Sequence, residues 1–160
     1  MESLTKPALD PKSVASFSGS GYPEPYRSRV LPRNKRRLGD ELGLTKIGVN
    51  FTTLPPGKES AMRHWHTHED EFVYVLEGEV VLCTDVGEQV LRAGSCAGFP
   101  AGAALGHHLV NRSAHPAVYL EISNRAAAED VAHYSDPDVD MVWNAPQARG
   151  RFARRDGSPF

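Results

Sequence analysis

The chain has 160 residues, about one domain, and its 40% hydrophobic and 24% charged residues are ordinary for a globular protein. A formal net charge of −2 argues against a nucleic-acid partner, because such proteins carry a strongly basic face. No apolar run approaches the roughly 20 residues of a membrane span, and the N-terminus lacks a signal-peptide core. The spacing of Cys83 and Cys96 gives no support for a disulfide, so we interpret them as free buried thiols in a cytoplasmic protein without membrane contact.

Residues 1–40 are rich in Pro, Gly, Ser and Arg, and we interpret them as an extended N-terminal arm with little core of its own. The arm carries a basic run, Arg33-Asn-Lys35-Arg36-Arg37. Such runs are commonly solvated, so we interpret this one as surface or as a subunit contact rather than as a binding site.

Residues 41–125 alternate short β-prone runs with turns, and we interpret them as a β-barrel domain. Strands are predicted, in chain order, at Leu44–Leu54, Phe72–Glu77, Glu79–Thr84, Gln89–Arg92, Cys96–Phe99, His107–Asn111 and Ala117–Ser123. Six or more strands at this spacing, without an amphipathic helix between them, predict an all-β sandwich or barrel. Residues 126–160 are interpreted as a loop-rich C-terminal extension that packs on the barrel, with Trp143 and Phe152 as anchoring side chains.

The strand that begins at Phe72 bears on assembly. If Glu71, Val73 and Val75 face the interior, then the side chains that face outward are also large and apolar: Phe72, Tyr74 and Leu76. A strand that is apolar on both faces needs cover on both, which the arm or a second subunit could supply. We therefore expect a homodimer, the most common soluble oligomer.

The segment His64-Trp-His66-Thr-His68-Glu-Asp-Glu71 carries the clearest chemical signal. On a strand, His64 and His66 point to the same face, and a short turn then lets Glu71 enter the next strand. One of His107 and His108 faces inward on a later strand and offers a fourth ligand. Imidazoles and a carboxylate are ligands of a divalent transition metal such as Zn, Fe, Mn or Ni, and this set leaves about two open positions on an octahedral ion.

These residues resemble the two sequence motifs of the cupin superfamily. The first motif is matched by Gly57, His64, His66, Glu71 and Gly78. The second motif is matched by Gly94, Pro100, Gly102, His107 and Asn111, with four residues between Gly102 and His107 where two are usual. The resemblance implies a double-stranded β-helix, or jelly roll, with one metal ion near one end of the barrel.

The resemblance also implies particular roles for residues near the metal. The spacing from histidine to Asn111 selects His107 rather than His108 as the fourth ligand, beside His64, His66 and Glu71. The longer loop Ala103–Gly106 would lie at the mouth of the site and shape the pocket. From strand parity alone, Tyr119 and Glu121 could reach the cavity or miss it, while His68 lies after the strand turns and is interpreted as a neighbour of the ligands or a surface residue.

A narrower likeness, carried by the string HWH…EDEFVYVLEGE, is to small single-domain bacterial cupins that are sometimes compared with sugar-phosphate isomerases. We favour a metal-dependent enzyme that acts on a small polar ligand such as a sugar or sugar phosphate. No catalytic residue is assigned, and neither a phosphate-binding glycine loop nor an inward Arg or Lys is identified. An iron-dependent dioxygenase and a non-catalytic small-molecule-binding protein remain alternatives, because fold does not fix activity.

Overall fold

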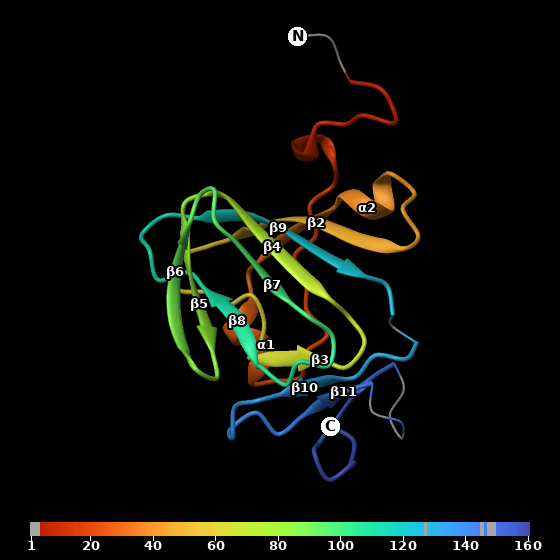
Figure 1. The fold of residues 1–160 in the computed structure, drawn as a ribbon, viewed down its shortest axis with the longest axis vertical. Helices are drawn as coiled ribbons and strands as arrows, with labels where there is room; N and C mark the ends of the chain where they lie inside the picture. Colours follow the sequence, from red (N-terminus) through yellow and green to blue (C-terminus); the bar gives the residue numbers. More distant parts are fainter. Residues whose placement is uncertain (1–3, 127, 145, 147–149) are drawn as a thin grey trace.

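Two antiparallel sheets form the walls of the fold in the computed structural model, which describes residues 4–126, 128–144, 146 and 150–160 (Figure 1). The five-stranded sheet has the order β1-β2-β9-β4-β7, and the seven-stranded sheet has the order β12-β11-β10-β3-β8-β5-β6. The predicted all-β jelly-roll barrel is confirmed. Among the described residues, the helical elements are short, and no helix is long and apolar enough to cross a membrane.

The strands have the following bounds: β1 Asn34–Arg37, β2 Ile47–Leu54, β3 His64–His66, β4 Glu71–Glu77, β5 Glu79–Thr84, β6 Gly87–Arg92, β7 Cys96–Phe99, β8 His107–Val110, β9 Ala117–Asn124, β10 Ala132–Tyr134, β11 Val142–Trp143 and β12 Phe152–Ala153. The helical elements are a 3-10 turn at Pro11–Ser13, α1 at Tyr26–Val30 and α2 at Leu38–Glu41. β5 and β7 have the predicted bounds, and the other predicted strands differ by one to three residues at one end.

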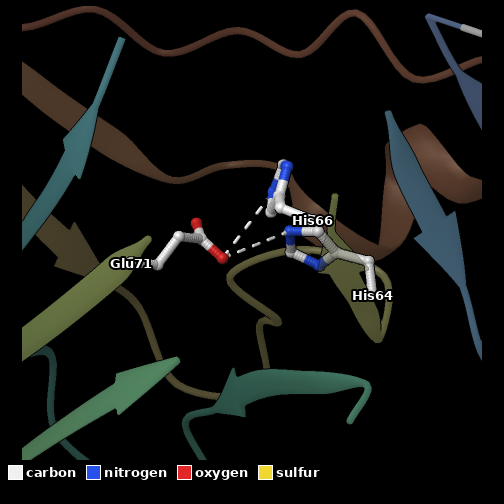
Figure 2. A group of neighbouring side chains, drawn as sticks. All are labelled: His64, His66 and Glu71. Atoms are coloured by element: carbon white, nitrogen blue, oxygen red, sulfur yellow. Dashed lines mark ion pairs between the residues drawn. The ribbon is translucent and has the colours of Figure 1, made fainter. Parts of the chain in front are cut away.

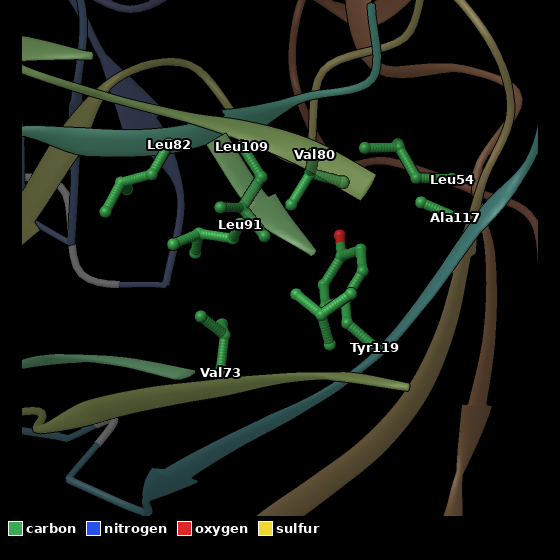
Figure 3. Packing of buried hydrophobic residues seen from close by; sticks show 9 residues of the cluster. Leu54, Val73, Val80, Leu82, Leu91, Leu109, Ala117 and Tyr119 are labelled. Carbon is green, nitrogen blue, oxygen red and sulfur yellow. The ribbon is translucent and has the colours of Figure 1, made fainter. Parts of the chain in front are cut away.

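The core lies between the two sheets, and both sheets contribute to it (Figure 3). The five-stranded sheet supplies Leu54, Val73, Val75, Ala117 and Tyr119, and the seven-stranded sheet supplies Val80, Leu82, Leu91 and Leu109. Burial of these side chains stabilises the barrel by about 25 cal/mol for each Å² of apolar surface removed from water. The pairing of the strands that supply this core determines which side chains face the interior, where the site lies.

β4 alternates as its sequence predicted. Val73 and Val75 are 8% and 0% exposed, so they lie inside the barrel. On the opposite face, Phe72, Tyr74 and Leu76 are 38%, 39% and 37% exposed. The outer apolar face of β4 is therefore uncovered in the single chain.

The N-terminal segment packs against the barrel over much of its length. Val14 and Leu38 join Phe51 and Val118 in an apolar cluster on the outer side of the five-stranded sheet. The sequence indicated no regular structure here, yet β1 pairs with β2 as the edge strand of this sheet. β1 consists of Asn-Lys-Arg-Arg, which has the composition of a solvated run, so only its pairing with β2 makes it a strand.

The C-terminal segment extends the seven-stranded sheet beside the histidine-bearing strand. β10 pairs antiparallel with β3, so that Ala132 lies opposite His66 and Tyr134 lies opposite His64. β11 and β12 continue the sheet, and Trp143 packs on Phe152 with ring centroids 4.8 Å apart. The C-terminal segment thus lies against one end of the barrel, and the first described residues of the chain extend beyond its opposite end along the long axis (Figure 1).

Candidate metal centre

Three short strands bring the predicted ligands to one place. β3 carries His64 and His66 on one face, because a single residue separates them. Glu71 is the first residue of β4 in the facing sheet, and His107 is the first residue of β8, where it pairs with His64. Figure 2 shows His64 and His66 directed at the carboxylate of Glu71.

One carboxylate oxygen is the point on which the group converges. Oε2 of Glu71 lies 2.9 Å from Nε2 of His107, 3.6 Å from Nε2 of His66 and 3.9 Å from Nε2 of His64. His64, His66 and Glu71 form a compact trio whose candidate ligand atoms all lie within 4.8 Å of one another. His107 joins this trio through Glu71, and its ring centroid lies 5.3 Å from that of His64.

The outward nitrogen of each of these histidines already has an acceptor. The Nδ1 contacts are His64 to the Met62 carbonyl at 2.8 Å, His66 to Oδ2 of Asp130 at 2.5 Å, and His107 to the Leu105 carbonyl at 3.2 Å. Assigned from these acceptors, the protons of His64 and His66 sit on Nδ1, and their Nε2 atoms turn lone pairs toward Glu71, whereas Nε2 of His107 lies within hydrogen-bond distance of Oε2 of Glu71 and donates to it. Lone pairs that face a carboxylate repel it unless a cation lies between them. The donor set therefore fits a divalent transition metal ion.

The electrostatics of the site favour the ligating forms. Burial outweighs the attraction of Glu71 and lowers the pKa of His64 to about 4, so its imidazole is neutral at pH 7. Burial acts to raise the pKa of Glu71, but the hydrogen bond from His107 and the charges of the histidines bring it down to about 2. Glu71 is therefore ionised and His64 neutral, as a metal ligand set requires.

Asp130 is a residue of the candidate site that the sequence did not predict. Its side chain is almost fully buried, and it accepts hydrogen bonds from Nδ1 of His66 and from the backbone N–H groups of His68 and Glu69, at 2.5, 2.8 and 3.3 Å. Burial acts to raise the pKa of Asp130, but these hydrogen bonds lower it below its usual value. Asp130 thus fixes the orientation of His66 and the turn after β3. No local motif identifies it, because it lies in a loop of the C-terminal segment.

A cavity of about 300 Å³ opens beside the ligands, at the lower end of the range for small-molecule pockets. Tyr119 and Glu121 both line this cavity, whereas strand parity alone had left open whether they reach it. Arg33 and Lys35 also line it, so the interpretation of these two residues as solvated surface is wrong. The reason is register: Lys35 pairs with Thr52, Thr52 pairs with the inward Tyr119, and paired residues share a face.

The remaining predicted residues stand outside the group that converges on Glu71, although His108 lines the same cavity. His108 turns its Nδ1 to the Ala61 carbonyl at 2.9 Å, and the side chains of His68 and His115 are exposed. The loop Ala103–Gly106 contributes no side chain to the cavity wall; instead, its carbonyl at residue 105 orients His107. Both cysteines are free thiols, but only Cys83 is buried, because Cys96 lies on the exposed side of β7.

Comparisons with known proteins show similarity in sequence and in fold. A family model for the cupin domain matches residues 50–123. The chain is 42% identical to a sugar phosphate isomerase from a cupin superfamily, from Silicibacter pomeroyi, over 96% of both chains, with a TM-score of 0.86. A provisionally named sugar phosphate isomerase from Acidithiobacillus ferrooxidans is 32% identical over 76% of this chain and 74% of that one, with a TM-score of 0.66.

A more distant solved structure shares the fold alone. The polyketide cyclase RemF from Streptomyces resistomycificus is 18% identical over 76% of this chain and 80% of its own, with a TM-score of 0.60. No curated protein sequence matches the chain.

Proposed function

The chain belongs to the cupin superfamily, and we propose that it is a metal-dependent isomerase of a small sugar phosphate. In this proposal His64, His66, Glu71 and His107 hold one divalent transition metal ion. One observation supports the metal site. Three histidine Nε2 atoms converge on Oε2 of Glu71, while the Nδ1 atom of each histidine contacts another acceptor. The likeness to the isomerase from Silicibacter pomeroyi supports the reaction and the substrate class.

A divalent ion bound there would act as a Lewis acid toward the carbonyl and neighbouring hydroxyl of an open-chain sugar. The protein supplies the rest. Asp130 holds His66 in the tautomer that donates its Nε2 lone pair, and the ring of Phe99 stacks on His107 at 3.5 Å between centroids and fixes its plane. Because the cavity is small, it admits a short sugar and leaves little room for bulk water.

Isomerisation also needs a group that moves a proton between adjacent carbons, and we propose Glu121 for this role. Glu121 pairs with Val73 across β9 and β4, on the inner face, so it lies diagonally from Glu71. The usual separation of such diagonal pairs is roughly 7–8 Å, which leaves space for a substrate between the metal ligands and the proton carrier. Nζ of Lys35 lies 2.6 Å from Oε2 of Glu121 and holds this carboxylate in position.

The experiment is an isomerase assay on metal-loaded protein without oxygen. Purified protein is stripped with EDTA, reloaded with Mn²⁺, Fe²⁺, Ni²⁺ or Zn²⁺, and incubated anaerobically in D₂O with triose to hexose phosphates. We expect aldose–ketose conversion with deuterium at the exchanged carbon, loss of conversion on stripping, and loss in His66→Ala. His115→Ala is the matched control, because His115 is exposed and remote from the ligands.

Three other results would contradict the proposal. Turnover that requires oxygen uptake with iron would identify a dioxygenase. Tight binding of sugars or acids without conversion by any metal form would identify a binding protein. Full activity of the stripped protein would refute the metal dependence.

A further inference from the structure

Arg33 is a cation on the cavity wall without a counter-ion among the residues that the structure describes. Its Nε is buried and has no hydrogen-bond partner among the described residues. No carboxylate in the described part of the chain lies within ion-pair distance of it, whereas other arginines are paired, for example Arg63 with Asp136 and Arg112 with Glu88. A buried charged donor without an acceptor is costly, so its retention in a cavity points to an anionic ligand.

The neighbouring cation cannot serve the same purpose. Lys35 forms an ion pair with Glu121 at 2.6 Å, and both side chains are largely buried, at 24% and 21% exposure. Their charges cancel at this point of the wall. The charge of Glu71 would likewise be offset by the bound cation. Arg33 is therefore the positive charge that remains for a ligand.

The wall around Arg33 supplies neutral donors as well. Tyr22 and Tyr119 line the same cavity. Burial raises the pKa of Tyr22, against the opposing effects of its hydrogen bond with Tyr134 and of the charge on Arg33. Burial also raises the pKa of Tyr119 well above its usual value, and the charge of Glu121 adds to the effect. Both phenols therefore stay protonated at neutral pH and can donate to an anion that the guanidinium holds.

We propose that Arg33 forms an anion subsite in the wall of this cavity that binds the phosphate group of the substrate. A guanidinium presents two parallel N–H donors to a phosphate, a geometry that lysine cannot match. Arg33 lies outside residues 50–123, the part that the cupin-domain model matches, so the arm supplies this recognition to the barrel. The inference rests on the proposed function in taking a sugar phosphate as substrate.

The test is calorimetric titration of inorganic phosphate into full-length, EDTA-stripped protein in 150 mM salt, so that no metal can bind the anion. We expect one phosphate per chain, binding that is about 10- to 100-fold weaker in Arg33→Gln, and an intermediate loss in Arg33→Lys. Arg37→Gln is the matched control. Arg37 lies on the same side of β1 but outside the cavity, and its replacement should change the affinity by less than about twofold because salt screens distant charges.

Metal uptake by Arg33→Gln should equal that of the wild type, which shows that the variant folds with its site intact. Wild-type affinity for phosphate in Arg33→Gln would overturn the proposal, and so would equally tight, Arg33-dependent binding of malonate, because the subsite would then select carboxylates. Arg33-dependent phosphate binding without any isomerisation would support the subsite and refute the isomerase. Isomerisation with an unchanged KM in Arg33→Gln would refute the subsite and leave the isomerase standing.

Discussion

Replacing Asp130 by asparagine should weaken metal binding while leaving the fold in place. Oδ1 of Asp130 accepts two backbone N–H groups, from His68 and Glu69, and Oδ2 accepts the Nδ1 proton of His66. The amide that Asp130→Asn introduces has one oxygen, and this oxygen will accept the hydrogen bonds of the two backbone N–H groups. Its NH₂ group must then face Nδ1 of His66, so the imidazole has to accept there and carry its proton on Nε2. A protonated Nε2 cannot ligate a metal.

The expected loss is about 10- to 100-fold in metal affinity, or about 1.4–2.7 kcal/mol, the range found when partners of ligating histidines are removed. The free energy of unfolding of the metal-free protein should fall by only about 1 kcal/mol, because the two backbone donors keep an acceptor. Metal affinity is measured by competition with a chromogenic chelator, and ¹⁵N NMR of the imidazoles reports which nitrogen of His66 is protonated.

Asp136→Asn is the control, because Asp136 pairs with Arg63 on the side away from the ligands. It should lose a comparable amount of stability without any change in metal affinity. If Asp130→Asn binds metal as tightly as the wild type while Nδ1 of His66 keeps its proton, the argument from the tautomer is wrong.

The remaining predictions concern the ligands, acid stability and assembly. His107→Ala and Glu71→Ala should lose most bound metal by elemental analysis while His108→Ala keeps it; loss in His108→Ala alone would show that the register of β8 has been misassigned. In EDTA, urea titrations should show the free energy of unfolding decreasing as the pH falls from 6.5 toward 4. In this range His64 binds a proton in the unfolded chain but not in the folded chain, where its pKa is lowered to about 4. His64→Asn should flatten that dependence, and an equally steep one would exclude His64 as its cause. We predict a dimer that covers the outer face of β4, so Tyr74→Glu should be monomeric by light scattering; a wild type that is itself monomeric at high concentration would contradict this.

The strands and the shared face of His64 and His66 could be derived from the sequence because their signals are local, whereas the choice of His107 over His108 came from the family resemblance. Alternation along residues 71–77 is enough to place Val73 inside and Phe72 outside, and His64 and His66 must share a face wherever their strand lies. The turn residues that bound each strand added the spacing of an all-β fold. These inferences needed no knowledge of which strands are neighbours.

The parts that could not be derived depend on pairings between distant segments. Asp130 reaches His66 across 64 positions, and only the β3–β10 ladder brings them together. Arg33 and Lys35 lie in a basic run whose composition is that of solvated surface. Which of these side chains turns inward follows from the register of β1 on β2, and a shift of one residue would have exchanged them with Asn34 and Arg36.

The ladder between β3 and β10 also determines when the site can mature during synthesis. A chain emerges from the ribosome N-terminus first, so β3 is available long before β10. Until residue 130 emerges, the imidazole of His66 has no acceptor on Nδ1, and the turn behind it lacks the carboxylate that ties down its N–H groups. A nascent chain can thus assemble much of its barrel while His66 still lacks the acceptor for its Nδ1. If the proposed metal binds, its loading would be a late event, and a ribosome stalled before residue 130 would yield a barrel that holds metal weakly.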